Sequence, residues 1–204
     1  MTRIFISRHG RTAWHEEGRF AGTADIPLDE YGRRQAEMVA SVLENEKFDC
    51  IFSSPLSRCL ELARIVARGH GLEVEIEPRL KEIELGDWDG LTYGEILKRD
   101  GELIKMWTSD PTCVTVPGGE SISDVFKRSM DWFYEVVNKY PEGQIFAVSH
   151  GGPIRAIIAG ILEMPLSRMF RIGVDLASIS IINFKGEFSY LETLNDTCHL
   201  SDIC

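Results

Sequence analysis

The chain has 204 residues, of which 44% are hydrophobic and 26% are charged. This composition is typical of a globular protein with its own hydrophobic core, and it excludes a disordered or fibrous chain. The formal net charge of −10 disfavours nucleic acid as a partner, because an acidic protein repels phosphates except at a local basic pocket.

The N-terminal half of the chain alternates short apolar runs with helical patterns. Three runs have the length and composition of strands: residues 3–7, 50–52 and 73–77. The alternation of polar and apolar residues at 73–77 indicates a strand at or near an edge. A helix is predicted over about 30–44, with Asp29 as its N-cap. A second helix is predicted from Ser54 onward, with Ser54 as N-cap and Pro55 at the first helical position.

The C-terminal half begins with a less regular stretch at residues 90–117, which we expect to be a lid-like insertion over a site. A helix is then predicted over about 122–140, where Ser121 and Asp124 have the spacing of a capping box. A strand, a helix and two closing strands follow at residues 144–148, 153–162, 177–184 and 188–194. The closing strands are joined at Lys185-Gly186.

This order of elements predicts a single α/β domain over residues 1–204. We expect a three-layer sandwich with a mostly parallel central sheet, helices on both faces and a small helical insertion over the site.

The ends of the chain and its cysteines indicate a cytoplasmic protein. The N-terminal residues lead directly into the first apolar run, without the pattern of a signal peptide. Arg155 and Glu163 interrupt the best candidate for a membrane span, so no membrane partner is expected. The five cysteines lack CxxC spacing and fit reduced thiols better than disulfides or a zinc site.

Three predicted strands are followed by polar segments that suit an anion. Arg8-His9-Gly10 follows the first strand, a segment ending in Arg58 follows the second, and His150 with Gly151 follows the strand at 144–148. In such a sheet, ligands bind at the carboxyl ends of the strands. Glycines allow close approach of the backbone, and helix N-termini and arginines bind anions. We therefore expect a positive pocket for a small phosphorylated substrate.

These residue types predict phosphoryl transfer. A neutral imidazole can accept a phosphoryl group, and neighbouring arginines disfavour the charged imidazolium. The arginines would also neutralise the oxygens of the transferring group. A general acid must then protonate the departing alkoxide. Four carboxylates are available, and their spacing does not choose among them: Glu82, Glu84, Asp87 and Asp89.

Six segments occur in an order that resembles the histidine phosphatase superfamily, the phosphoglycerate-mutase-like proteins. They are RHGRTAWHEEGRFAG, DIPLDEYGRRQA, SSPLSRCLELA, LKEIELGDWDGLT, VPGGES and SHGGPIRAII. The resemblance implies that His9 is the nucleophile and becomes a phosphohistidine, while Arg8, Arg58 and His150 hold the phosphoryl oxygens. It implies that Glu82, within Leu80-Lys81-Glu82, is the proton donor and later activates water. It implies no metal and no organic cofactor.

Two positions depart from the family's usual pattern. The family usually has Glu or Gln at the position of Arg11, and Asn at the position of His15. Arg11 adds positive charge and would select a more anionic substrate, whereas His15 would give phosphate a hydrogen bond of pH-dependent strength. Together with Gly22 and Gly151, these two residues are the candidate substrate-binding residues.

Several segments are similar to the α-ribazole phosphatases of cobalamin nucleotide-loop assembly: LGDWDGLTYGEI, PGGES, HGGPIR and LNDTCHL. Glu82 is followed by Ile-Glu-Leu-Gly, where phosphoglycerate mutases typically have Arg-His-Tyr-Gly. We therefore expect a phosphomonoesterase, with α-ribazole 5′-phosphate as a candidate substrate whose base would suit an apolar roof of Trp88, Tyr93 and Trp107.

Other interpretations remain open. The alternatives are a phosphoglycerate mutase and a non-catalytic phosphate-binding regulatory protein. A nucleotide-binding Rossmann domain is disfavoured because no GxGxxG follows the first strand. A homodimer is one of the assemblies left open.

Overall fold

The structure is a computed structural model that describes residues 1–186 and 188–203. The described residues form a six-stranded sheet in the order β3-β2-β4-β1-β5-β6. Its strands are β1 (Thr2–Arg8), β2 (Cys50–Ser53), β3 (Val74–Ile76), β4 (Gln144–Ser149), β5 (Ile179–Lys185) and β6 (Phe188–Asp196).

Helices of two kinds connect these strands. The α-helices are α1 (Ala13–Glu16), α2 (Glu30–Leu43), α3 (Ser57–His70), α4 (Tyr93–Ser109), α5 (Ile122–Lys139) and α6 (Gly151–Ile161). Short 3₁₀ helices are η1 (Pro78–Leu80), η2 (Gly86–Trp88), η3 (Pro111–Cys113), η4 (Leu166–Arg171) and η5 (Cys198–Ile203). Among the residues described, no helix is both long enough and apolar enough to cross a bilayer.

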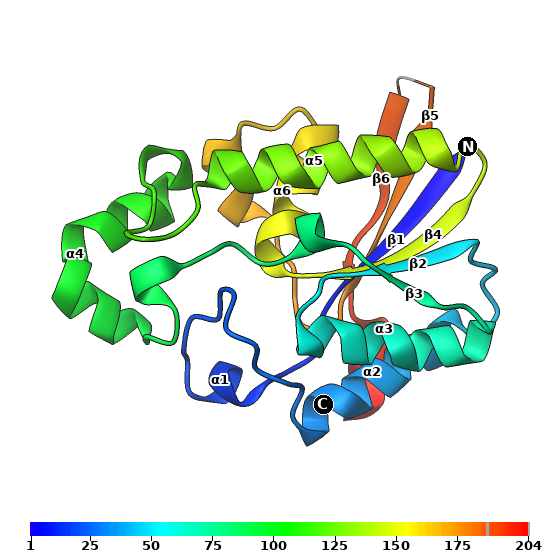
Figure 1. Ribbon diagram of the computed structural model, residues 1–204, viewed down its shortest axis with the longest axis horizontal. Helices are drawn as coiled ribbons and strands as arrows, with labels where there is room; N and C mark the ends of the chain where they lie inside the picture. Colours follow the sequence, from blue (N-terminus) through cyan, green and yellow to red (C-terminus); the bar gives the residue numbers. More distant parts are fainter. Residues whose placement is uncertain (187, 204) are drawn as a thin grey trace.

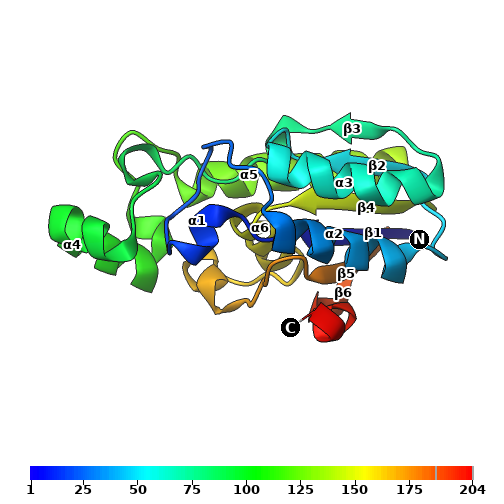
Figure 2. The ribbon, with the colours of Figure 1, turned by 90° about the horizontal axis from the view of Figure 1, so that it is seen from below.

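The sheet lies between two pairs of helices, with α5 and α6 on one face and α2 and α3 on the other (Figure 1, Figure 2). Strand β1 shows how the sequence produces this arrangement. Ile4 and Ile6 pack in the core beneath α5 and α6, whereas Phe5 packs in the core with α2 and α3. Alternate residues of a strand point to opposite faces. The predicted α/β sandwich is therefore confirmed.

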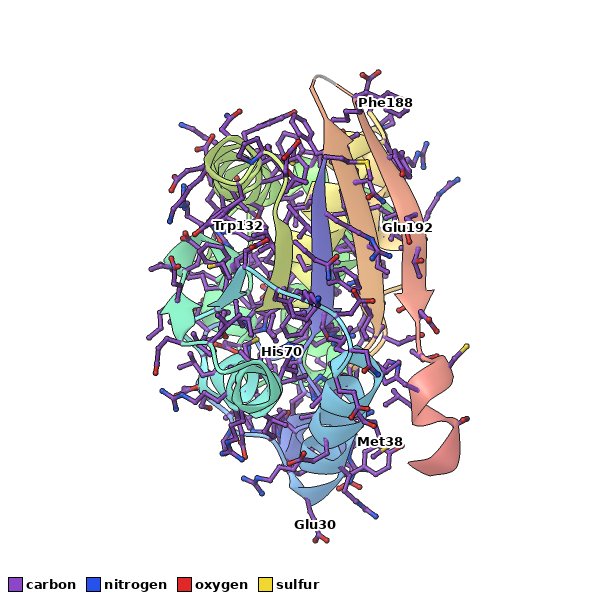
Figure 3. The ribbon with its side chains drawn as sticks, turned by 90° about the vertical axis from the view of Figure 1, so that its right-hand side faces the viewer. Glu30, Met38, His70, Trp132, Phe188 and Glu192 are labelled. Atoms are coloured by element: carbon purple, nitrogen blue, oxygen red, sulfur yellow. The ribbon has the colours of Figure 1, made fainter. Side chains whose placement is uncertain are left out.

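The directions of the strands place the carboxyl ends of β2, β4 and β1 side by side. Strands β1, β4, β2 and β3 pair in parallel, and β5 and β6 add antiparallel strands at the β1 side. The edge position predicted for residues 73–77 is confirmed by β3. The other edge is β6, along which Phe188 and Glu192 lie (Figure 3). The carboxyl ends of β1, β2 and β4 face the side on which α1 and α4 lie (Figure 1).

Two predicted helix starts are wrong. Helix α3 begins at Ser57 with Leu56 as N-cap, not at Pro55 with Ser54 as N-cap. The Ser54 hydroxyl instead lies 2.7 Å from Nε2 of His150. Asp25 takes over the capping role from a distant segment, because its carboxylate accepts from the Ser57 amide at 2.7 Å. Helix α6 begins two residues earlier than predicted, with His150 as N-cap.

The stretch at 90–117 is more helical than its sequence pattern suggests. Helix α4 starts at a capping box between Thr92 and Glu95 and has a kink at Asp100. The Asp100 carboxylate accepts a hydrogen bond from the Trp88 indole at 2.8 Å, which ties α4 to the preceding segment. Movement of this segment as a lid stays a prediction. By contrast, the capping box predicted at Ser121 is confirmed at the start of α5.

Candidate active site

The two histidines predicted at strand ends lie beside each other. His9 follows β1 and His150 follows β4, and these strands are parallel neighbours in the sheet. The His9 amide donates to the Ser149 carbonyl oxygen at 3.1 Å, which fixes the two strand ends together. The two rings have centroids 5.0 Å apart, and both residues are buried.

The ring of His9 is held in one tautomer. Its Nδ1 lies 2.7 Å from the carbonyl oxygen of Gly10, and a carbonyl can only accept, so Nδ1 must carry the proton. Burial is the main cause that lowers the pKa of His9 well below its usual value, and His150, Arg58 and Arg8 add to the effect. The ring is therefore neutral, and Nε2 keeps a free lone pair.

Arg58 is fully buried near the start of α3, and its guanidinium is hydrogen-bonded to the loop at residues 22–24. Its Nη1 donates to the Ala24 carbonyl oxygen and its Nη2 to that of Gly22, each at 2.8 Å. The same loop is fixed from its other side, because the Asp89 carboxylate accepts from the amides of Gly22 and Ala24 at 2.8 and 2.9 Å. Gly22 thus acts through its backbone, and Asp89 is an anchor of the loop that holds Arg58.

Arg8 and His15 lie beside each other at the predicted pocket. Nδ1 of His15 lies 2.8 Å from the Thr12 hydroxyl and 3.2 Å from the Thr12 amide. Nε2 of His15 lies 3.4 Å from Nη2 of Arg8, while Nη1 of Arg8 donates to the Val174 carbonyl oxygen. An anionic oxygen at this point would accept from the Arg8 guanidinium. The pair is therefore suited to a phosphoryl oxygen.

The expected pH dependence of the His15 hydrogen bond does not arise near neutral pH. Burial lowers the pKa of His15 to about 4, and the cationic Arg8 and Arg58 contribute to the shift. The ring is consequently neutral throughout the physiological range.

Among the four candidate carboxylates, Glu82 is the one that lies beside the predicted phosphate pocket. Its Oε1 accepts from the Gly152 amide at 3.1 Å, at the N-terminus of α6. Glu82 also lines a cavity of about 220 Å³ together with Arg8. Glu84 and Asp87 are instead paired with Lys81 and Arg99 at the surface.

Arg128 of α5 was not among the candidates and holds the backbone that carries Glu82. Its guanidinium donates to the carbonyl oxygens of Arg79, Lys81 and Glu82 at 2.6, 2.7 and 3.2 Å. Both carboxylate oxygens of Glu120 accept from the same guanidinium, at 2.7 and 2.9 Å. In the sequence, Arg128 is one more charged residue on an amphipathic helix, so no local signal reveals this contact.

Arg155 of α6 is a second residue that the sequence did not single out as part of the site. It is half-buried and lies on the wall of the cavity beside Glu82. Side chains on a helix lean toward its N-terminus, and the Arg155 guanidinium reaches back to Gly151. A Cβ atom on Gly151 would lie only 2.7 Å from Nη1 of Arg155. Gly151 is predicted to let the backbone approach a ligand closely, and its lack of a side chain also leaves room for the Arg155 guanidinium.

The rest of this cavity is apolar and aromatic. Its other lining residues are Phe20, Ala21, Ile83, Leu85, Trp107, Ile122, Gly152 and Phe170. Of the three aromatic residues expected as a roof, Trp107 lines this cavity. Trp88 is fully buried in the core, and Tyr93 is 44% exposed.

Arg11 lies outside this cavity, and its charge is compensated by other residues. Its Nε donates to the Asp29 carboxylate at 2.8 Å, and Nη1 lies 3.0 Å from the Glu16 carboxylate. The guanidinium also stacks over the Tyr31 ring, 4.5 Å from its centroid. The expected action of Arg11 on the substrate therefore has no contact to support it here and stays a prediction.

Comparison with known proteins gives consistent results. Residues 4–197 match the family model described as the histidine phosphatase superfamily (branch 1). Phosphoserine phosphatase 1 of Hydrogenobacter thermophilus is 34% identical over 202 residues, covering 99% of this chain and 96% of that protein. The adenosylcobalamin/alpha-ribazole phosphatase of Escherichia coli is 30% identical, with 95% of each chain covered. The solved structure of YhfR from Bacillus stearothermophilus superposes with a TM-score of 0.94 at 29% identity, covering 98% of this chain and 100% of that one.

Proposed function

The chain belongs to the histidine phosphatase superfamily, and from this we propose that it hydrolyses phosphomonoesters through a phosphohistidine formed on His9. Its relatives named as phosphatases support the reaction class, a phosphoric monoester hydrolase. The observation that carries the proposal is the state of His9. Its ring is neutral, its Nδ1 proton is held by Gly10, and its other nitrogen is free beside two arginines.

In the first step, Nε2 of His9 attacks the phosphorus atom and the bond to the ester oxygen breaks. Arg8 and Arg58 neutralise the charge on the phosphoryl oxygens, where it is spread in the transition state. Ring N–H groups of His150 and His15 supply further donors at the same pocket. The protonated carboxyl group of Glu82 gives its proton to the departing alkoxide.

In the second step, water replaces the alcohol. The Glu82 carboxylate takes a proton from a water molecule, which attacks the phosphorus atom and releases His9 and inorganic phosphate. The same residue thus serves as acid and then as base, and it starts the next cycle protonated. Because the chain's own residues supply the charge neutralisation and the proton, we expect turnover to be insensitive to EDTA.

The leaving group would occupy the cavity beside Glu82. Phe20, Trp107 and Phe170 supply flat apolar surface there, which supports α-ribazole 5′-phosphate as a candidate substrate and a role in cobalamin nucleotide-loop assembly. The cavity volume is about 220 Å³, below the roughly 300–1,000 Å³ of common ligand pockets, so a leaving group as large as α-ribazole would extend from it toward solvent. Phosphoserine, named in a relative, is a second candidate because the cavity also contains Arg155.

Trapping of the intermediate tests the proposal. Protein incubated with ³²P-labelled acetyl phosphate and quenched in alkali should retain label in wild type and lose it in His9→Ala, with turnover of p-nitrophenyl phosphate lost in parallel. His70→Ala is the matched control, since His70 packs against Phe48 at the far end of α3. Wild type that neither retains label nor turns over p-nitrophenyl phosphate would instead support the non-catalytic alternative, and turnover that survives His9→Ala would show that His9 is not the nucleophile.

A substrate panel separates the remaining alternatives. α-Ribazole 5′-phosphate, phosphoserine and 3-phosphoglycerate should be compared by kcat/KM in the presence of EDTA. Release of inorganic phosphate supports the phosphatase. Isomerisation of 3-phosphoglycerate that requires a bisphosphoglycerate would support the mutase.

A further inference from the structure

The segment at residues 172–178, between η4 and β5, holds Arg8 and His9 in place. Nη1 of Arg8 donates to the Val174 carbonyl oxygen at 2.8 Å. The Ala177 amide donates to the His9 carbonyl oxygen at 3.1 Å. The positions of the nucleophile and of the arginine beside it therefore depend on where this segment lies.

Asn195, near the end of β6, clamps this segment with its side-chain amide. Its Oδ1 accepts from the Asp175 backbone amide at 2.6 Å, and its Nδ2 donates to the Asp175 carboxylate at 2.7 Å. The Asp175 N–H and the Val174 carbonyl belong to the same peptide group, which is planar and rigid. Asn195 and Arg8 therefore hold opposite ends of one peptide group, and the clamp fixes the carbonyl oxygen that accepts from Arg8.

The backbone of Asn195 is itself fixed, in a conformation that asparagine and glycine adopt more readily than other residues. Its φ is 55°, in the left-handed region. Its amide donates to the Ser180 hydroxyl of β5 at 3.0 Å, which anchors the clamp to the sheet. A glycine at this position would suit the backbone equally well but would supply no clamp, so the two requirements can be separated by experiment.

We propose that Asn195 is a positioning residue for Arg8 and acts through the peptide group between Val174 and Asp175. This inference rests on the proposed function, in which Arg8 binds the phosphoryl group. With Nη1 of Arg8 held by the clamped carbonyl oxygen, Nη2 is directed to its place beside His15. A guanidinium fixed in advance needs no reorganisation when charge develops in the transition state. A displacement of about 1 Å would reduce that stabilisation.

Asn195→Gly tests the side chain without disturbing the backbone. We expect kcat/KM to fall about tenfold to hundredfold. The loss should be equal for p-nitrophenyl phosphate and an alkyl phosphate, with weaker inhibition by vanadate, because Arg8 binds the phosphoryl group of both esters. In an Arg8→Ala background the same substitution should change kcat/KM by less than about twofold, since the guanidinium that it positions is gone. Glu163→Gly is the matched control, because Glu163 also has a positive φ, 51°, but is exposed beyond the end of α6.

Two results would overturn the inference while wild type still forms a phosphohistidine on His9, so that the proposed function stands. One is wild-type kcat/KM and vanadate inhibition in Asn195→Gly, which would mean that only the backbone conformation requires asparagine. The other is an equal loss from Asn195→Gly with and without the Arg8 side chain.

Urea unfolding checks that Asn195→Gly folds. Should it fail to fold, Asn195→Asp keeps the acceptor for the Asp175 amide but sets two carboxylates against each other. Its kcat/KM relative to wild type should then be lower at pH 8 than at pH 5.5, where two adjacent carboxylates can share a proton. A ratio that does not change with pH would contradict the clamp.

Discussion

The guanidinium of Arg128 and the backbone of Glu82 are joined directly, because Nη2 of Arg128 donates to the Glu82 carbonyl oxygen at 3.2 Å. The same guanidinium also donates to the carbonyl oxygens of Arg79 and Lys81 and is itself fixed by Glu120. The position of the Glu82 carboxyl group therefore depends on a residue of α5 that does not line the cavity.

Arg128→Ala should impair proton donation more than phosphoryl binding. Alkyl phosphates need an acid to protonate a basic alkoxide, whereas p-nitrophenolate leaves without one, so kcat should fall about 10²-fold for an alkyl ester and much less for p-nitrophenyl phosphate. Removing one partner of the part-buried Arg128–Glu120 ion pair also costs roughly 1–3 kcal/mol of stability, measured by urea unfolding. Lys127→Ala, an exposed neighbour on α5, is the control. Equal losses on both esters would show that Arg128 is only structural.

The two buried histidines should make stability fall in mild acid. The pKa values of His9 and His150 lie well below the ordinary value of 6.5 in the folded protein, mainly because of burial. Below pH 6.5 the unfolded chain takes up protons that the folded chain refuses, so stability is complete above about pH 7 and decreases as the pH falls. Each histidine should cost about 1.4 kcal/mol at one pH unit below 6.5.

Urea unfolding at pH 7.5 and 5.5 measures this effect. Wild type should lose more stability between the two pH values than His9→Asn, because that variant lacks one of the titrating groups. Identical losses in the two proteins would contradict a depressed pKa for His9.

Sequence patterns predict the sheet and the phosphate pocket because both depend on local order along the chain. The consecutive apolar residues Ile4, Phe5 and Ile6 define β1, and the strand-end position singles out His9. Arg128 and Arg155 escape such reasoning, since each looks like a solvated charge on an amphipathic helix. Their roles depend on which distant backbone packs opposite, and this is a tertiary property.

Sequence patterns also do not distinguish the roles of the acidic residues between positions 82 and 89. Glu82 and Asp89 lie seven positions apart, and both are carboxylates in an irregular segment. Only the three-dimensional arrangement shows that Glu82 accepts from the Gly152 amide, whereas Asp89 accepts from the amides of Gly22 and Ala24. The same holds for the cap of α3, which Asp25 supplies from outside the helix.

Asp89→Asn should weaken the pocket through Arg58. An asparagine side chain has one acceptor oxygen, so one of the amides of Gly22 and Ala24 loses its partner and the loop that holds Arg58 loosens. We expect kcat/KM to fall about tenfold, and equally for p-nitrophenyl phosphate and alkyl esters, with weaker inhibition by vanadate. Asp87→Asn is the control, because Asp87 pairs with Arg99 at the surface. A loss confined to alkyl esters would instead identify Asp89 as the general acid.

His15→Asn should preserve phosphate binding better than His15→Leu. An asparagine N–H₂ group can replace a ring N–H as a donor to phosphate, so inhibition by vanadate should change less than threefold, whereas leucine should weaken it about tenfold. In wild type, ¹⁵N NMR should show the His15 ring neutral down to about pH 5. A ring protonated at pH 6.5 would contradict the burial-depressed pKa.

Gly151 and Gly152 are neighbours on α6 that make room for different groups. A Cβ atom on Gly152 would lie 2.4 Å from Oε1 of Glu82, and one on Gly151 would lie 2.7 Å from Nη1 of Arg155. In both cases the obstructed atom is at the end of a flexible side chain, so alanine should displace the side chain and leave the helix intact. Alanine also has a higher helix propensity than glycine, by about 1 kcal/mol, so we expect both variants to fold.

The two alanine variants should therefore lose activity on different substrates. Gly152→Ala displaces the general acid, and kcat for alkyl phosphates should fall about 10²-fold, with a smaller loss for p-nitrophenyl phosphate. Gly151→Ala displaces the Arg155 guanidinium and should lower kcat/KM more for phosphoserine than for phosphoethanolamine, which lacks the carboxylate that a guanidinium can bind. Gly69→Ala on α3, where a Cβ atom meets nothing within 4 Å, is the control for the substitution itself. Identical substrate profiles for Gly151→Ala and Gly152→Ala would mean that proton donation and leaving-group recognition are not separate functions of these two side chains.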